Sequence, residues 1–430
     1  MTTPAERAAI ISIGDELTVG QSLDTNSRWL SGRLTSLGLS VVEHATVPDD
    51  LERIVATMRR LAESCHTLIV TGGLGPTADD LTREALSEVL GEPLVEDENS
   101  LAAIRRWFSI SDRAMPERNR VQALRPTSGV HLPNPNGTAP GIRVVVGGAT
   151  VHCLPGPPSE MHPMFEASVA PLIIPPGGRT IRTRVIQTAG LGESDVAQRL
   201  GPLMDRDRKP LVGTTASRGV VSVRIRDESA DPADIADARI SDTADEVRRA
   251  VGEWIFAEDD APLPEIVLNR LRAAGERLVV VESCTGGMLG QAITAVPGSS
   301  DAFLGGWITY SNALKHALVG VPLRALEEHG AVSAEVALAM ASGGLDRSGA
   351  HHALAITGVA GPGGGTHAKP VGTVWIARAS RDGDPDVRRF RMRGERDTIR
   401  DWSVTSALLI LDQRLRHAPS TRLLRQSELR

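Results

Sequence analysis

Short apolar runs alternate with amphipathic segments over the first third of the chain. The alternation predicts strands at 8–16, 39–47 and 66–75, with helices at 27–38 and 51–64 between them. This order is typical of a parallel sheet with crossover helices. A further apolar strand at 142–148 is followed by Pro and Gly, so we expect one α/β domain over residues 1–175.

The pattern changes in the middle of the chain and then returns. Residues 178–258 predict a strand, a helix, two strands separated by Ser217-Arg218-Gly219, and a long polar helix over 231–251, which together form a small α+β module. A charged, Pro-bearing stretch at 257–264 is typical of a linker. A second α/β domain is expected over 262–420, with helices at 264–274, 285–295 and 333–343 and strands at 277–283, 307–312, 352–358 and 373–379.

Composition excludes several classes of protein. A chain of 430 residues exceeds what one hydrophobic core usually serves, and no apolar run reaches the roughly 20 residues of a membrane span. Glu6 and Arg7 stand where a secretory signal would be apolar, so we expect a soluble, cytoplasmic protein. Three distant cysteines fit reduced thiols, and a net charge of −6 favours small substrates over nucleic acid.

Lysine is rare in a chain whose cations are otherwise arginine. It occurs only at Lys209, Lys315 and Lys369, and the single tyrosine is Tyr310. A desolvated lysine can lose its proton near neutral pH, whereas arginine cannot. Chance placement is the alternative, but the pattern favours a role for a carboxy-terminal lysine that needs a removable proton.

Small-residue loops follow the predicted strands of the last domain. The sequence Glu282-Ser-Cys-Thr-Gly-Gly287 follows an apolar strand and opens a predicted helix, where backbone N–H groups and the helix dipole receive phosphate. Further small-residue loops at 297–303, 308–316, 356–365 and 369–375 predict a nucleotide pocket. No Ser-His-Asp set is evident, but a Ser-Lys pair would supply a nucleophile and its base.

Residues 262–415 resemble the nicotinamide-nucleotide amidohydrolase domain of the CinA family through ESCTGG, PGSS, TYSN, GAVS, TGVAGPGGG and KPVGTV. The resemblance implies conversion of nicotinamide mononucleotide to nicotinate mononucleotide and ammonia, without a metal. It implies Ser300 as nucleophile, Lys315 as its base and Tyr310 as an orienting residue. It also implies that Thr357 and Ser283 hold the oxyanion or carboxamide, that Arg396 grips the phosphate, and that Thr285, Gly286, Gly287 and Gly358 complete the substrate site.

Other interpretations of these residues stay open. Ser300 is also a plausible helix N-cap, and Ser299 is its nearest competitor as nucleophile. His316 is expected on a helix surface, with a general-base role as the alternative. Cys284 is expected to be a small packed residue and not a thiolate nucleophile.

Acidic residues follow the first and third predicted strands of the amino-terminal domain. Loops that leave the carboxyl ends of parallel strands form the ligand crevice of such a sheet. Gly72, Gly73 and Gly75 allow close approach of a phosphate, and neighbouring carboxylates suggest a magnesium ion that activates water against a pyrophosphate bond. Helix capping by Asp24 and Asp79 is the structural alternative.

Residues 6–170 resemble the molybdopterin-binding-like domain of the same family through GDELxxG, DTN, TGGLGPTxDDLT, PNGTAPG and LPGPPSEM, with VPDD at 47–50 where the family has Val-Gly-Asp. The resemblance implies a metal-dependent pyrophosphatase acting on ADP-ribose or NAD-like dinucleotides, and a non-catalytic pterin or nucleotide binding module is the alternative. Implied metal ligands are Asp15, Glu16, Asp79, Asp80 and Glu84; implied substrate contacts are Gly72, Gly73, Gly75, Thr77, Asn26, Asn136, Gly137 and Thr138.

The middle module resembles the KH-like domain of full-length members. The nearest approach to a nucleic-acid-binding GXXG loop is Gly190-Leu191-Gly192-Glu193, whose acidic residue is unfavourable. We therefore expect a structural or dimer-forming module, no nucleic-acid partner, and a homodimer.

Overall fold

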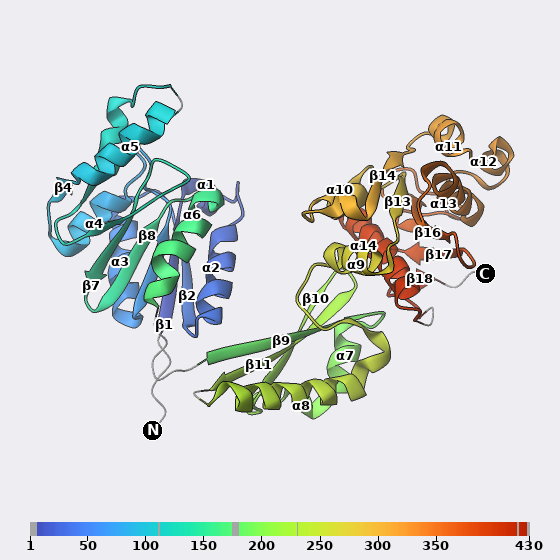
Figure 1. Ribbon diagram of the computed structural model, residues 1–430, viewed down its shortest axis with the longest axis horizontal. Helices are drawn as coiled ribbons and strands as arrows, with labels where there is room; N and C mark the ends of the chain where they lie inside the picture. The colour runs from blue at the N-terminus through green and yellow to red at the C-terminus, as the bar shows by residue number, and fades with distance from the viewer. Residues whose placement is uncertain (1–6, 111, 174–179, 230, 419–420, 428–430) are drawn as a thin grey trace. The chain divides into compact units, whose positions relative to one another are not determined.

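The chain forms two compact units in a computed structural model that describes residues 7–110, 112–173, 180–229, 231–418 and 421–427. Glu6 and the predicted boundary at 175 lie outside the described residues. One unit comprises Met1–Arg182 with Asp227–Asp237, and the other comprises Thr183–Arg226 with Ala238–Arg430. The two units are described separately below (Figure 1).

The first unit is built on a sheet of order β2-β1-β3-β8-β7-β6. Strands β2, β1 and β3 are parallel, as predicted, and β8, which was not predicted as a separate strand, continues them in parallel. Strand β7 pairs antiparallel with both β8 and β6, so the sheet is mixed. The reason is the two-residue turn Gly147-Gly148, whose positive φ angles of 62° and 129° make a hairpin that only antiparallel strands allow. The strands are β1 (Arg7–Ile13), β2 (Ser40–Val47), β3 (Thr67–Thr71), β6 (Val130–Leu132), β7 (Gly141–Val146) and β8 (Ala149–Leu154), beside a small pair, β4 (Leu94–Glu96) and β5 (Leu124–Pro126).

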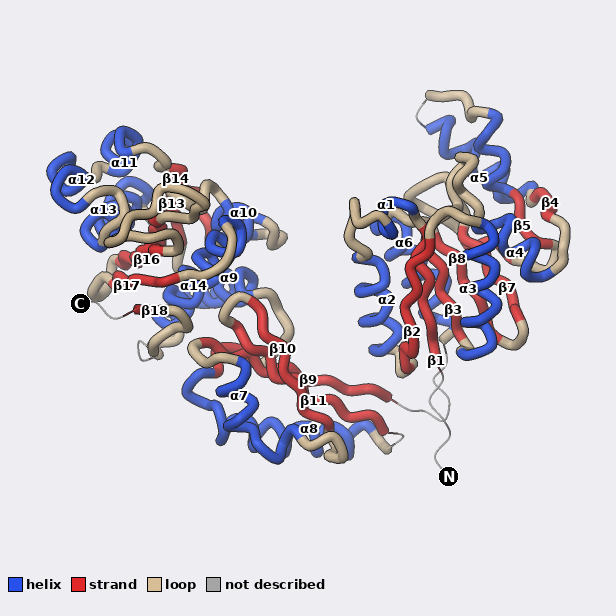
Figure 2. The backbone as a smooth tube through the Cα atoms, turned by 180° about the vertical axis from the view of Figure 1, so that it is seen from behind, coloured by secondary structure: helices blue, strands red, loops and turns tan. Residues whose placement is uncertain are grey.

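Both faces of this sheet are covered by helices (Figure 2). Alternate residues of β1 enter opposite cores: Ile11 packs with the residues of α3 and α4, and Ile10 packs with those of α2 and α6. Burial on both faces explains why the strands are continuously apolar in sequence. The helices are α1 (Asp15–Thr18), α2 (Thr25–Ser36), α3 (Leu51–Ser64), α4 (Thr82–Leu90), α5 (Glu98–Ile110) and α6 (Pro158–Met164).

The middle module has the element order predicted from the sequence. Arg218 and Gly219, with φ of 52° and 90°, form the two-residue turn between β10 and β11. The sheet order is β10-β11-β9-β12. Helix α8 buries Ile240, Ala244 and Val247 at helical spacing in the module's core. The elements are β9 (Thr180–Ala189), α7 (Glu193–Leu200), β10 (Leu211–Ser217), β11 (Val220–Ser229), α8 (Ala233–Val251) and β12 (Ile255–Ala257).

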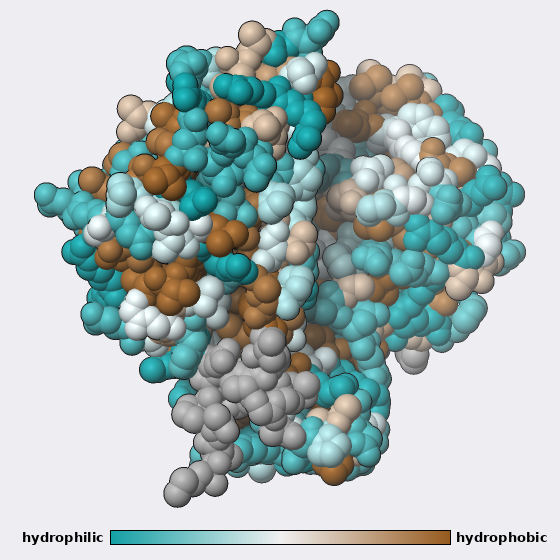
Figure 3. Space-filling view, turned by 60° about the vertical axis from the view of Figure 1, so that its left-hand side comes forward, coloured by the Kyte–Doolittle hydropathy of each residue, from teal (hydrophilic) through white to brown (hydrophobic). Residues whose placement is uncertain are grey.

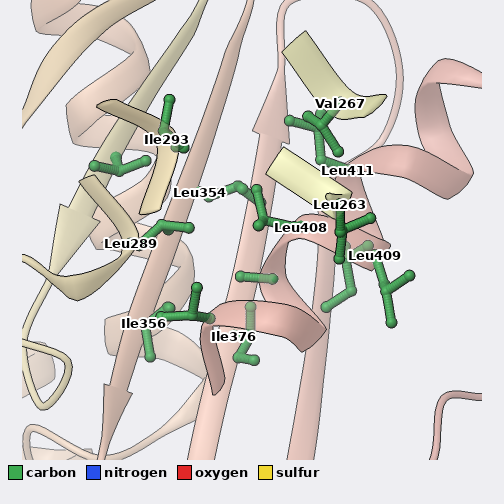
Figure 4. Close-up of a cluster of buried hydrophobic side chains, with 14 of the residues drawn as sticks. Leu263, Val267, Leu289, Ile293, Leu354, Ile356, Ile376, Leu408, Leu409 and Leu411 are labelled. Carbon is green, nitrogen blue, oxygen red and sulfur yellow. The ribbon is translucent and has the colours of Figure 1, made fainter. Parts of the chain in front are cut away.

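The last part of the second unit is a six-stranded sheet of order β14-β13-β15-β16-β17-β18. Strands β14, β13 and β15 are parallel, and β16 to β18 continue the sheet antiparallel. Helices α9, α10 and α14 cover one face, where Figure 4 shows leucine, isoleucine and valine side chains of these helices meeting those of β15 and β16. Helix α13 covers the other face. The bounds are α9 (Leu263–Ala274), β13 (Leu278–Glu282), α10 (Met288–Thr294), β14 (Phe303–Ile308), α11 (Asn312–Val319), α12 (Leu323–His329), α13 (Ala334–Ser348), β15 (His352–Gly358), β16 (Thr373–Ser380), β17 (Asp386–Arg391), α14 (Arg396–Leu415) and β18 (Gln426–Ser427).

The helix expected at 333–343 is α13, which continues to Ser348, and two further elements differ from their predicted bounds in ways that affect the candidate site. The strand expected at 307–312 is β14, which begins at Phe303 and ends at Ile308, so Thr309 and the residues after it form a loop. The helix expected from residue 285 begins only at Met288, because Gly286 and Gly287 have positive φ angles of 59° and 99° that a right-handed helix cannot contain. Both differences reposition the candidate site.

The described helices include none that is long and apolar enough to cross a membrane. On the face drawn in Figure 3, hydrophilic and hydrophobic side chains are intermixed.

Candidate active sites

Three parallel strands end together in the second unit. In the register of the sheet, Glu282 of β13 pairs with Ile308 of β14 and with Ile356 of β15. The residues that directly follow these strands therefore meet at one edge, the carboxyl edge, where parallel sheets bind their ligands.

A buried serine and lysine face each other at this edge. Lys315 Nζ lies 3.0 Å from Ser283 Oγ, and it donates to the backbone oxygens of Thr309 (2.9 Å) and Tyr310 (3.3 Å). The Lys315 side chain is only 1% exposed, and burial lowers its pKa. No carboxylate is among these partners, and a neutral amine can donate its two hydrogens to the carbonyls of Thr309 and Tyr310 while its lone pair accepts the Ser283 proton.

Ser300, the predicted nucleophile, lies at the opposite edge of the sheet. It belongs to the short helix Ser299–Asp301, which precedes β14. The six residues of β14 separate it from the loop that leads to Lys315, a distance of about 20 Å at about 3.3 Å per residue. The structure therefore does not bring Ser300, or its neighbour Ser299, to Lys315. Ser283 occupies that place.

A cavity of about 270 Å³ opens beside the Ser283 and Lys315 pair. Among the residues predicted for the amidohydrolase site, Thr285, Gly286, Gly287 and Ser300 do not line it. Its walls are Ser283, Cys284, Tyr310, Lys315, Ala331, Val332, Thr357, Gly358, Val359, Ala360, Gly361, Gly363, Gly364 and Arg396.

The amino terminus of α10 is already occupied. The buried carboxylate of Glu282 accepts hydrogen bonds from the backbone N–H groups of Gly287 (3.0 Å), Leu289 (3.0 Å) and Gly290 (2.9 Å). These are the groups that the sequence suggested for a substrate phosphate, so that prediction was wrong. The ESCTGG motif contained the signal, because an acid just before a Gly-rich turn is able to cap the helix that follows it.

Arg396, the first residue of α14, reaches the same cavity. Its Nη1 donates to the backbone oxygen of Gly361 at 2.7 Å, and its Nη2 lies 3.3 Å from the hydroxyl of Tyr310. Tyr310 thus touches Lys315 through its carbonyl and Arg396 through its ring hydroxyl. The guanidinium brings a positive charge to the cavity wall beside the glycine-rich loop after β15.

Thr357 lines the cavity with its hydroxyl already committed as a donor. Its Oγ1 donates to the backbone oxygen of Ala331 at 2.7 Å, and the side chain is 1% exposed. The oxygen is left to accept a hydrogen bond, which suits a carboxamide N–H group and not an oxyanion.

The alternative nucleophile and base have other contacts. Cys284 is buried, and burial raises the pKa of its thiol to about 12, so it remains protonated at neutral pH. The ring of the exposed His316 contacts the backbone oxygen of Val321 at 2.9 Å through Nδ1. Neither residue competes with Lys315 for the Ser283 hydroxyl.

A second candidate site lies at the carboxyl ends of β1 and β3 in the first unit. It is a crevice of about 380 Å³. Seven of the predicted residues line it, namely Glu16, Gly72, Gly73, Gly75, Asp79, Asp80 and Thr138. Asp15, Thr77, Glu84 and Asn136 do not line this crevice, while Gly137 and Asn26 line two separate neighbouring cavities.

Asp80, predicted as a metal ligand, braces the glycine-rich loop. Its carboxylate accepts the backbone N–H groups of Gly75 (2.7 Å) and Thr77 (2.8 Å) and also contacts the Thr77 hydroxyl. The Asp80 carboxylate is therefore engaged by the loop. The N–H and hydroxyl of Thr77, which were expected to contact the substrate, donate to Asp80. Glu84 lies on α4, away from the crevice.

Carboxylates gather around Asp49, which the sequence analysis did not select. Asp49 and Asp15 exchange hydrogen bonds, each backbone N–H donating to the other's carboxylate, at 2.9 and 3.2 Å. Burial raises the pKa of Asp49, and the charges of Asp15, Asp79 and Glu16 raise it further. In the sequence, Asp49 could have been selected as the second residue after Val47 in the VPDD stretch that follows the predicted strand at 39–47.

The fit of this crevice to a metal ion is partial. Among the residues that the structure describes, no three His, Cys, Asp or Glu side chains stand together as a metal site. The described residues therefore do not form a complete set of protein ligands for a metal ion. The converging negative charge does fit magnesium held by one or two carboxylates together with substrate phosphates.

Comparison with known proteins accounts for nearly the whole chain. Residues 9–174 match the model of a probable molybdopterin binding domain, 183–257 the damage-inducible protein CinA KH domain, and 260–415 the CinA C-terminal domain. A CinA-like protein of Synechococcus sp. strain RCC307 is 43% identical over 415 residues, covering 96% of this chain and 99% of its own. One from Parasynechococcus marenigrum is 41% identical over 410 residues, covering 94% and 97%.

Among solved structures, the competence/damage inducible protein CihA from Agrobacterium tumefaciens is 39% identical over 36% of this chain and 93% of its own, with a TM-score of 0.35.

Fold and matches together define an α/β protein with a molybdopterin-binding-like mixed sheet, a KH domain and a carboxy-terminal α/β domain. The chain belongs to the CinA family.

Proposed function

We propose that the protein is a hydrolase whose carboxy-terminal site deamidates nicotinamide mononucleotide with Ser283 as nucleophile and Lys315 as base. The observation that carries this proposal is the 3.0 Å contact between Lys315 Nζ and Ser283 Oγ in a buried setting. Arg396, which lines the same cavity, supports a substrate with a phosphate. Ser283 replaces Ser300 in the role that the sequence suggested.

The residues of the site can carry out both halves of the reaction. Ser283 Oγ attacks the carboxamide carbon while neutral Lys315 takes the hydroxyl proton. The C–N bond of the tetrahedral intermediate then breaks while Lys315 gives the proton to the departing nitrogen. Ammonia leaves, and the rest of the substrate stays bound to Ser283 as an ester. Water then attacks this ester with Lys315 again as base. Nicotinate mononucleotide is released, and the hydroxyl of Ser283 is restored. No metal is needed for these steps.

A three-variant comparison tests the assignment. Ser283→Ala and Lys315→Ala should each lower the rate of ammonia release from nicotinamide mononucleotide by roughly 10³-fold. Ser300→Ala, at the other sheet edge, is the matched control and should stay within twofold of the unmodified protein. Full activity in Ser283→Ala, or loss in Ser300→Ala, would contradict the assignment.

We further propose that the amino-terminal crevice cleaves the pyrophosphate bond of ADP-ribose or of NAD-like dinucleotides with magnesium. The glycines at 72, 73 and 75 and the carboxylates of Glu16, Asp49 and Asp79 support it, because they place backbone and negative charge on one cavity. Magnesium would be held by Glu16 and Asp79 with the substrate phosphates and would supply an activated water.

The alternative for this domain is a module that binds a pterin or nucleotide without turnover. The match to a probable molybdopterin binding domain favours that reading. Assays of ADP-ribose cleavage with magnesium and with excess chelator distinguish the two. Magnesium-dependent cleavage supports the pyrophosphatase, and equal turnover in chelator rules out the metal role.

A homodimer is proposed as the assembly, with no nucleic-acid partner. Strand β14 is an edge strand and leaves Leu304 42% and Ile308 52% exposed, beside the exposed ring of Tyr310. Exposed apolar side chains on an edge strand favour pairing with a second copy. Sedimentation equilibrium of the full chain, compared with Ile308→Lys, tests this association.

A further inference from the structure

Arg400 of α14 contacts the turn that carries the proposed nucleophile. Its Nη2 donates to the backbone oxygen of Thr285 at 2.8 Å. The same nitrogen lies 3.8 Å from the position that a Cβ atom on Gly286 would take. The guanidinium therefore lies against the middle of the turn that leads from Ser283 to α10. Its other nitrogen, Nη1, donates to the carboxylate of Asp397 at 3.2 Å.

The turn after Ser283 contains two adjacent glycines and needs support from outside. Gly286 and Gly287 have φ angles of 59° and 99°, and glycine backbone adopts many conformations at little cost. Ser283 itself joins this turn to the end of β13, where its N–H donates to the backbone oxygen of Ile356 at 2.9 Å. A displacement of the turn would therefore move Ser283 relative to Lys315, and a shift of about 1 Å can lower a rate by about 100-fold.

Two side chains support this turn at different points. The Glu282 carboxylate accepts hydrogen bonds from Gly287 onward and so stabilises the start of α10. Arg400 instead donates to the carbonyl of Thr285, the second residue after Ser283. Thr285 is 0% exposed, and a hydrogen bond from a charged donor is stronger in such a buried place than in water.

Helix α14 is a firm base for the Arg400 side chain. Ile399 and Ser403, which flank Arg400 on the helix, are 1% and 0% exposed, and Ile399 belongs to the hydrophobic core. Farther along, Trp402 packs against the hairpin turn of the middle module, because a Cβ atom on Gly219 would lie 2.9 Å from its ring. The helix is therefore fixed both by the core and by the middle module.

Arg396 and Arg400 lie on the same face of α14, since they are four residues apart. Arg396 lines the cavity, and Arg400 does not. The first arginine is therefore placed to contact a substrate, whereas the second contacts the protein backbone beside the nucleophile.

We infer that Arg400 is a positioning residue of the amidase, which fixes Ser283 opposite Lys315 by binding the Thr285 carbonyl. This inference rests on the proposed amidase function and adds a residue outside the substrate cavity. Because Arg400 acts on the turn and not on the substrate, its removal should lower turnover and leave substrate affinity unchanged. The effect should not depend on whether the substrate carries a phosphate.

Three variants of the full chain test this role. Arg400→Ala should lower kcat for ammonia release from nicotinamide mononucleotide roughly 30-fold, with KM within twofold. Nicotinamide riboside should show the same fall in kcat. Arg400→Lys keeps a donor for the carbonyl and should restore kcat to within about threefold of the unmodified protein. Asp397→Ala is the matched control, because it removes only the 86% exposed partner of Arg400, and kcat should stay within twofold.

Amide hydrogen exchange tests the contact independently of activity. In Arg400→Ala, residues 283–287 should exchange at least tenfold faster than in the unmodified protein, and in Asp397→Ala they should exchange at the same rate. If the unmodified protein releases no ammonia, the proposed amidase is rejected, while the exchange rates still decide whether Arg400 supports the turn. Unchanged exchange or unchanged kcat in Arg400→Ala, or a loss of activity confined to nicotinamide mononucleotide, overturns the inference.

Discussion

The carboxylate of Glu282 and the backbone N–H of Gly287 are joined by a 3.0 Å hydrogen bond that closes the turn containing Ser283. Two further N–H groups of α10 share this carboxylate, which is 1% exposed. The Glu282 carboxylate therefore stabilises the turn, while the side chain of the next residue, Ser283, faces Lys315.

Replacing Glu282 should weaken the carboxy-terminal domain. Glu282→Ala leaves buried N–H groups without an acceptor, and we expect a loss of roughly 3 kcal/mol in the free energy of unfolding. Urea unfolding measures it. Asp301→Ala is the control, because Asp301 is exposed and its ion pair with Arg272 is long, so it should change stability by less than about 0.5 kcal/mol. Equal effects of the two changes would contradict the capping role.

Amidase activity should depend on the protonation of Lys315. Burial lowers the pKa of this amine, and only its neutral form accepts the Ser283 proton. The rate constant for nicotinamide mononucleotide should therefore rise with pH until Lys315 has titrated and then level off. Rates measured across pH 5 to 10 give this profile, and a rate that falls over the whole range would exclude Lys315 as base.

The same residue should leave a signature in stability. Because the pKa of Lys315 is lower in the folded protein than in the unfolded chain, the unfolded chain binds more protons between the two values. Its contribution to stability therefore increases as pH rises through that window and is complete above the unfolded pKa. The difference in unfolding free energy between the unmodified protein and Lys315→Met, followed against pH, should show this slope; a flat difference would argue against the shift.

Arg396 should act on the phosphate of the substrate. Arg396→Ala is expected to lower kcat/KM for nicotinamide mononucleotide by roughly 30-fold, the value of a charge-assisted hydrogen bond. Nicotinamide riboside lacks the phosphate and should lose less than threefold. Tyr310→Phe, which removes the hydroxyl beside Arg396, should have a smaller effect. An equal loss with both substrates would assign Arg396 to a structural role.

Substitutions of Asp79 and Asp80 should have different effects on stability and on catalysis. Asp80→Ala removes the brace of the glycine-rich loop and should destabilise the first unit by roughly 2 kcal/mol. Asp79 is exposed, so Asp79→Ala should leave the unfolding transition unchanged while it lowers magnesium-dependent cleavage of ADP-ribose. Thermal unfolding and cleavage rates are measured on both variants. Equal changes in stability and in cleavage rate for the two variants would reject these roles.

Periodicity and turn chemistry were sufficient for most of the fold. The helix at 51–64 and the hairpin around Arg218 and Gly219 follow from local pattern alone, and the structure has both. The strand expected at 142–148 is β7, but its antiparallel partner β8 was not predicted, because the Gly-Gly turn between two apolar runs was not interpreted as a hairpin. The late start of α10 depends on the positive φ of two glycines, which a helical pattern does not reveal.

By itself the sequence determined that the chain has α/β domains at both ends and that Lys315 is an unusual residue in an arginine-rich chain. The resemblance to the CinA family also selected Arg396, Tyr310 and Thr357, which line one cavity in the structure. Only the tertiary structure decided which serine meets the lysine. Ser283 and Ser300 both lie in small-residue loops, but the length and register of β14 place Ser300 at the amino edge of the sheet and Ser283 at the carboxyl edge. Such pairing across strands is set by packing of the whole sheet, so no local pattern specifies it.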